Sequence, residues 1–99
     1  MPTQEQIFNV AKKALTMSDF SFNEDTFDIC LIPFDFGDCN IQSLIYNHVL
    51  NCKENEAIMS IYKKDKTDIV FVKYSGIKWE GKDMAPKKLA YKISSWDDE

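Results

Sequence analysis

Residues 57–78 read AIMSIYKKDKTDIVFVKYSGIK. Two runs rich in strand-forming residues, 57–63 and 68–78, flank the polar tetrapeptide KDKT at 64–67, which is typical of a hairpin loop. Gly76 interrupts the second run and marks a bulge or the end of the strand. The segment therefore predicts two consecutive antiparallel strands of a β-meander.

Two other segments predict helices. In residues 3–16, apolar side chains recur at helical spacing, and Thr3 with Gln6 forms a capping-box pair at the start. Residues 40–52 follow the same spacing, with Asp38 or Asn40 as the candidate cap. Their content of Ile, Tyr and Val leaves a strand as the alternative for this second segment.

Residues 20–34 and 87–96 complete the set of predicted elements. The first predicts β structure whose final strand, 26–34, carries apolar side chains on both faces and is limited by Pro33, so we expect burial on both sides. The second fits a strand or a short helix begun by Pro86. We favour the strand because it completes an antiparallel sheet. Residues 97–99 are expected to form a frayed tail.

These elements predict the fold class. The chain of 99 residues is 44% apolar and 28% charged, which is ordinary for a globular domain. Its length suits one domain, covering residues 1–99, with a single modest core. The order of helices and strands predicts an α+β domain in which two helices pack on one face of an antiparallel sheet of about four strands.

The composition argues against several functions. No apolar run approaches the roughly 20 residues that span a bilayer, and residues 1–6 lack the basic start of a secretory signal. We therefore expect a cytoplasmic protein, in its own cell or a host cell, with no membrane partner. The chain has 16 acidic residues, 12 Lys, no Arg and a net charge of -4. This balance disfavours nucleic-acid binding and phosphate clamping.

Charge is distributed unevenly along the chain. Residues 18–52 contain six acids and no cation, whereas residues 57–96 contain nine Lys and four acids. An acidic surface steers a basic partner, and exposed Phe side chains beside it can anchor that partner. The candidate partner-binding residues are Asp19, Glu24, Asp25, Phe34, Asp35, Phe36 and Asp38. The alternative is two differently charged solvent-exposed faces, or attraction between the halves within the fold.

Two further groups of residues suggest other binding functions, each with a simpler structural explanation. Lys63, Lys64 and Lys66, with other Lys and the interleaved Tyr62, Tyr74, Trp79 and Tyr91, would form a platform for single-stranded nucleic acid if they shared one face of the sheet. Lysine on an edge strand also simply prevents aggregation. The residues Cys30, Cys39, His48 and Cys52 are possible zinc ligands but lack a C-x2-C knuckle, and small buried thiols are the simpler interpretation.

No catalytic residue, metal ligand or cofactor is assigned. Nucleotide-binding and hydrolase motifs are missing, and neither a Cys39–His48 nucleophile nor an Asp35–Asp38 acid–base pair has a supporting signature. We therefore expect no enzymatic activity. The three cysteines are too few, and odd in number, for a disulfide framework.

The sequence favours a small protein-binding domain that acts as an inhibitor through one protein–protein interface. Stand-alone acidic domains of this size without cofactor motifs include immunity proteins and phage-encoded inhibitors of host systems. The comparison rests on size, charge and the lack of motifs, and not on a shared sequence motif. The alternatives are a single-stranded nucleic-acid or ribonucleoprotein module that uses the Lys-rich half, and a small zinc- or thiol-dependent protein. A free sheet edge could also pair with its copy in a homo-oligomer.

Overall fold

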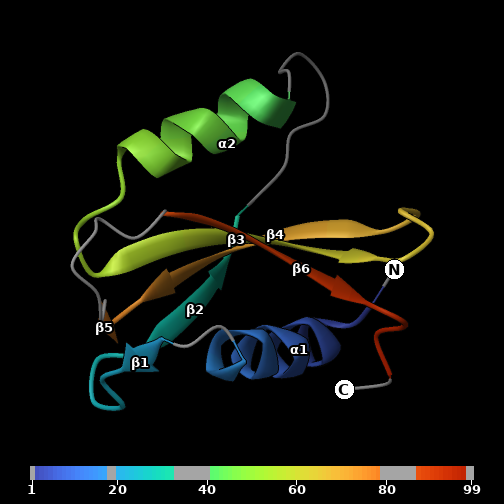
Figure 1. Ribbon diagram of the computed structural model, residues 1–99, viewed down its shortest axis with the longest axis horizontal. Coiled ribbons are helices and arrows are strands. Elements are labelled where there is room, and N and C mark those ends of the chain that lie inside the picture. Colours follow the sequence, from blue (N-terminus) through green and yellow to red (C-terminus); the bar gives the residue numbers. More distant parts are fainter. Residues whose placement is uncertain (1, 18–19, 33–40, 79–86, 98–99) are drawn as a thin grey trace.

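The predicted hairpin of residues 57–78 lies at the centre of the fold (Figure 1). The computed structural model describes residues 2–17, 20–32, 41–78 and 87–97. Within them the chain forms a small α+β domain with two helices and mixed sheets. The elements are α1 (Gln4–Thr16), β1 (Ser21–Phe22), β2 (Asp28–Leu31), α2 (Ile41–Leu50), β3 (Glu56–Lys63), β4 (Ile69–Ser75), β5 (Ile77–Lys78) and β6 (Lys88–Ile93).

The main sheet has the strand order β2-β4-β3-β6, and β1 and β5 form a separate two-stranded sheet. The pairs β2–β4 and β3–β4 are antiparallel, as predicted, but β6 runs parallel to β3. The expectation of a purely antiparallel sheet is therefore wrong. With β2 paired to one side of β4 and β3 to the other, β6 lies beside β3. Alternation of apolar residues predicts a strand but not its direction, so the sequence of 87–96 did not indicate the parallel pairing.

The two helices cover opposite faces of the sheet, which corrects the prediction that they share one face (Figure 1). Helix α1 packs with Met59 and Val72, whereas Ile45 of α2 packs with Ile58 and Phe71. Alternate residues of a strand point to opposite faces, so these are two separate cores. The physical reason is the apolar character of β3 on both faces: each face needs its own cover.

Helix α1 forms as predicted. The Thr3 side chain accepts a hydrogen bond from the Gln6 backbone N–H, and the Gln6 side chain accepts one from the Thr3 N–H. The reciprocal pair satisfies two donors that a helix start otherwise leaves unpaired. The Tyr74 hydroxyl, which is buried in β4, donates to the Ala11 carbonyl at 2.7 Å and ties the helix to the sheet.

Strand β2 differs from the expectation of burial on both faces. Asp28, Cys30 and Leu31 are exposed, and Ile29 is half-buried. The strand lies at the edge of the sheet, and the buried side chain of the α2 core comes from Ile32, just past its end. Apolar alternation alone does not distinguish an edge strand from a central one.

The remaining predicted features are placed as follows. Segment 87–96 is a strand, as favoured, and Gly76 lies at the end of β4 with a positive φ of 81°. Of the predicted tail, Asp97 accepts a hydrogen bond from the Gln6 side chain, so this residue is held against α1. Asp38, Asn40, Pro33 and Pro86 lie outside the described residues. No described helix is both long and apolar enough to cross a membrane.

Candidate protein-interaction surface

Two of the seven predicted partner-binding residues lie in the described part of the chain. Glu24 and Asp25 are exposed in the turn between β1 and β2. The Asn23 carbonyl accepts from the Thr26 N–H at 3.1 Å, and the Asn23 side chain accepts from the Asp25 N–H at 3.0 Å. The other five residues lie outside the described residues. These are Asp19, Phe34, Asp35, Phe36 and Asp38.

The described Phe residues of this region belong to the α1 core. Phe20, Phe22 and Phe27 pack against it, and the rings of Phe22 and Phe27 are 4.4 Å apart. Phe27 also stacks near Tyr74, with ring centroids 6.3 Å apart. Their contribution is therefore to packing, whereas Phe34 and Phe36, the predicted anchors for a partner, lie outside the described residues.

The outer face of α2 carries large exposed side chains. The side chains of Tyr46 and Leu50 are 63% and 62% exposed, and they lie one turn apart on the same face of the helix. Helix α2 contains no Asp, Glu, Lys or Arg in a chain that is 28% charged. Exposed aromatic and aliphatic side chains with few charges are typical of the centre of a protein–protein interface.

We define the α2 outer face as Ser43, Tyr46, Asn47 and Leu50, all of them exposed. Sequence reasoning missed it because it followed only the buried stripe of residues 40–52 and did not consider the opposite side of the helix. The available signal was the lack of charge on any side of the helix. A surface helix of a small domain usually opposes its apolar stripe with charged residues.

The opposite side of α2 holds the helix on the sheet. Ile45 is buried against the cluster of Ile32, Ile58 and Phe71, and Val49 packs beside them. These contacts involve only the side of the helix that faces the sheet. Within the described residues, the outer face of α2 is not packed against another element. The packing of Ile45 and Val49 therefore fixes the position of α2, and with it the position of the outer face.

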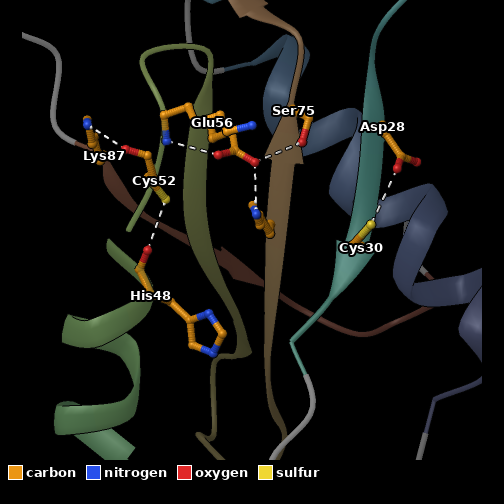
Figure 2. Close-up of polar contacts among 9 residues, drawn as sticks. Asp28, Cys30, His48, Cys52, Glu56, Ser75 and Lys87 are labelled. Carbon is orange, nitrogen blue, oxygen red and sulfur yellow. Dashed lines mark hydrogen bonds and ion pairs between the residues drawn. The ribbon is translucent and has the colours of Figure 1, made fainter. Parts of the chain in front are cut away.

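Polar contacts fix the connection after α2 (Figure 2). The Glu56 carboxylate accepts from the Lys53 backbone N–H at 2.9 Å and pairs with Lys73 Nζ at 2.8 Å. The Lys73 side chain holds the pKa of Glu56 below its ordinary value, with the Lys53 N–H adding to the effect. Lys87 Nζ donates to the Cys52 carbonyl at 2.9 Å. The cluster is thus an anchor for the C-terminal end of α2.

The two described thiols are not activated. The Cys52 Sγ donates to the backbone carbonyl of His48, and Figure 2 shows the imidazole directed away from the sulfur. Burial raises the pKa of the Cys52 thiol. The Cys30 thiol donates to the Asp28 carboxylate, and this bond raises the pKa of Cys30. A nucleophilic cysteine needs the reverse, a lowered pKa.

Among the described residues, the structure brings together neither a group of the proposed metal ligands nor the three tyrosines of the proposed nucleic-acid platform on one face of the sheet. In the described residues no group of three or more His, Cys, Asp or Glu side chains could hold a metal ion, and Cys39 lies outside them. Tyr74 and Tyr91 belong to the α1 core, whereas Tyr62 lies on the opposite face, in register with Lys92 and Ile69. Trp79 is not among the described residues.

A groove separates α2 from the outer strand β6. It has a volume of about 660 Å³ and is lined by six residues of α2, including Ile45, Tyr46 and Val49, and by Lys88. It is mixed in character, with apolar and amide side chains on the helix and a cation on the strand. Tyr46 lies on both the groove and the α2 outer face, so the two surfaces are continuous.

Comparison of the chain with protein-family models, with curated proteins and with solved structures finds no match in any of the three.

Proposed function

We propose that this protein is a small, non-enzymatic inhibitor domain that binds one protein partner and occludes a surface of it, in the manner of immunity proteins or phage-encoded inhibitors. The α2 outer face is the contact region. The partner has an apolar pocket that receives Tyr46 and Leu50. The surface around this pocket is basic, because it must complement a chain with a net charge of -4.

The observation that carries this proposal is the exposure of Tyr46 and Leu50 on a helix without charged residues. Tyrosine is enriched among the residues that contribute most to binding, because it brings a large contact area at a small cost in side-chain entropy. The inner stripe of α2 is fixed by Ile45, so the pair needs little reorganisation before binding.

The acidic segment 18–52 has a supporting role in this proposal. Glu24 and Asp25 are exposed, and Asp28 is exposed at the start of β2. Exposed charges around an interface mainly raise the association rate. Charge reversal at Glu24 and Asp25, or at Asp35 and Asp38, is therefore expected to slow association and to weaken its dependence on salt.

Site-specific photocrosslinking tests the contact region. The variant Tyr46→p-benzoylphenylalanine should give one discrete crosslinked protein in native lysate, competed by unmodified protein and lost when Leu50→Asn is added. The matched control, Lys12→p-benzoylphenylalanine on the exposed side of α1, should give none. The crosslinked protein is then purified, and its own activity should fall to near zero at equimolar inhibitor. Equal crosslinking from both positions, or full partner activity in the complex, would overturn the proposal.

A further inference from the structure

We infer that the outer edge of β6 is a strand-addition site for an extended, acidic protein segment. This inference rests on the proposed function, because it names the chemistry of a segment that the partner would supply. It adds the edge of the sheet as a second contact beside the α2 outer face, and because the two contacts involve different residues, they can be tested separately.

The first observation is the direction of the backbone groups of β6. Ile58 N donates to the Lys87 carbonyl at 2.7 Å, and Lys64 N donates to the Ile93 carbonyl at 2.9 Å. Since backbone groups alternate in direction along a strand, the odd-numbered residues of β6 bond to β3. The N–H and C=O groups of Lys88, Ala90 and Lys92 therefore face away from β3.

The second observation is that this edge is open in the described part of the chain. Strand β6 ends the order β2-β4-β3-β6, and no described strand lies beyond it. The opposite edge, β2, is different: the Asp28 carboxylate accepts from the Ile29 N–H at 2.9 Å and so occupies an edge donor. The carboxylate thus takes up one outward N–H of β2, whereas no outward group of β6 is taken up in this way among its described contacts.

The third observation is the charge pattern of β6. Lys88, Ala90 and Lys92 are exposed and lie on the α2 face, in register with Ile58, Ser60 and Tyr62. The two Lys are four residues apart, or about 13 Å along the strand. The small Ala90 between them leaves room for a larger side chain opposite it, and Lys88 also lines the groove beside α2.

These features specify the segment. Opposite-charge pairs across neighbouring strands stabilise their pairing. An added strand therefore carries carboxylates at positions i and i+4, next to Lys88 and Lys92, and a neutral residue at i+2, next to Ala90. Its other face carries apolar residues, because Leu89 and Tyr91 are half-buried apolar side chains there. Main-chain hydrogen bonds supply affinity, and the alternating side chains supply specificity.

A second copy of β6 fits the edge less well. In an antiparallel pair of β6 strands centred on Ala90, Lys88 of each strand faces Lys92 of the other. Like charges directly opposite one another destabilise a strand pair. The same Lys pair therefore disfavours self-pairing through β6 and favours an acidic segment.

The test uses a fluorescent synthetic peptide with Glu at i and i+4, Thr at i+2 and Val at i+1 and i+3. Fluorescence anisotropy at low salt should show binding to the full chain, and hydrogen exchange of the Lys88, Ala90 and Lys92 amides should slow. A peptide with Lys in place of Glu should not bind. A peptide N-methylated at alternate amides should not bind either, because it cannot pair with a strand edge.

Variants of the protein separate edge pairing from general charge. Lys88→Glu with Lys92→Glu should weaken binding about tenfold or more, because two attractive pairs become repulsive, while Lys12→Glu with Lys78→Glu makes the same change in net charge and should leave binding nearly unchanged. Ala90→Pro removes an outward N–H but no β3–β6 hydrogen bond, so the fold should persist while binding is lost.

The inference is overturned if the Glu and Lys peptides bind equally, if the N-methylated peptide binds like its parent, or if reversal at Lys88 and Lys92 leaves peptide binding unchanged and only promotes self-association. That last result would mean that Lys88 and Lys92 serve only to prevent the exposed strand from pairing with other chains. If these results appear while the Tyr46 crosslink persists, the proposed function stands without this site.

Discussion

The side chains of Lys73 and Glu56 form an ion pair, with Nζ 2.8 Å from Oε2, across the neighbouring strands β4 and β3. Glu56 is buried, and its other oxygen accepts from the Lys53 N–H in the connection that follows α2. One carboxylate therefore joins the two central strands to the segment that fixes the end of α2.

Removal of the Lys73 charge should destabilise the fold. Lys73→Met leaves the buried Glu56 carboxylate without its cation, while the Lys53 N–H remains as a partner. The expected loss is about 1–2 kcal/mol, since the Lys73 side chain is 37% exposed and the pair is partly screened by solvent. Urea unfolding at pH 7 measures it, and the exposed Lys64→Met should change stability by less than about 0.5 kcal/mol. Equal effects of the two variants would contradict the assigned role of the pair.

The same pair makes stability depend on pH. The folded-state pKa of Glu56 lies below its ordinary value of 4.5. A lowered folded-state pKa adds stability that is fully present above the unfolded-state pKa and is lost as the pH falls through the folded-state pKa. Stability should therefore decrease as the pH drops below about 4.5. Glu56→Gln should be less stable than the parent at pH 7, and its stability should fall less between pH 7 and pH 3. A parallel decline in both proteins would place the pH dependence on other carboxylates.

Gly76 is expected to tolerate no side chain. Its φ is 81°, and a Cβ there would lie 2.8 Å from the backbone nitrogen of Phe27 and from the backbone of Thr26. Gly76→Ala therefore combines a left-handed conformation that L-residues disfavour with a contact against immobile backbone. The expected cost is about 2 kcal/mol or more. Thermal unfolding followed by circular dichroism measures it, and Ala90→Ser on the exposed edge serves as a neutral control. A change of less than 0.5 kcal/mol would mean that the β4–β5 turn rearranges.

Sequence patterns predicted the local structure well where the signals were short-range. The capping box at Thr3 and Gln6, the helical spacing of α1 and the turn at Gly76 each involve neighbours within a few residues, and each is confirmed. The arrangement of the helices was not predicted, because periodicity states which face of an element is apolar and not which neighbour covers it. Ile58 and Met59 are adjacent, apolar and buried in different cores. That burial on both faces was the clue to a helix on each side.

The candidate interaction surface was harder to predict. The helical spacing of residues 40–52 placed Ile45 on the buried stripe, as the structure has it, but it could not show that the side chains on the other side of the helix, such as Tyr46, are left uncovered by the rest of the fold. The parallel direction of β6 is likewise set by tertiary packing, since alternation of apolar residues indicates a strand and not its direction. These properties arise from long-range packing, and the acidic binding site predicted at residues 19–38 stays a prediction.

The two described thiols should react slowly with alkylating reagents. Both pKa values are raised, that of Cys30 mainly by its bond to Asp28 and that of Cys52 mainly by burial. Because the thiolate is the reacting species, iodoacetamide at pH 8 should modify both more slowly than free cysteine, with Cys52 the slower. Peptide mapping by mass spectrometry resolves the two sites. Asp28→Asn should speed modification of Cys30 and leave Cys52 unchanged. Faster modification of Cys52 than of free cysteine would revive a thiol-dependent function.

Helix α2 allows its supporting and contacting sides to be separated. Ile45→Ala removes a buried side chain and should cost about 2–4 kcal/mol of stability. Leu50→Ala, on the 62% exposed side, should change stability by less than about 0.5 kcal/mol. Chemical unfolding of both variants measures this difference. Once the crosslinked partner is purified, Leu50→Ala should weaken its binding at least tenfold, because truncation of a central interface residue costs more than about 1.4 kcal/mol.

The combination of the two readouts identifies the role of the helix. A residue that supports the fold loses stability when it is truncated, and any loss of binding follows from unfolding. A residue that contacts a partner loses binding at full stability. If Leu50→Ala unfolds as readily as Ile45→Ala, the outer face of α2 is packed against part of the chain and is no interface. If Leu50→Ala is stable and binds the partner unchanged, the partner contacts another surface, and the exposed β6 edge becomes the next region to test.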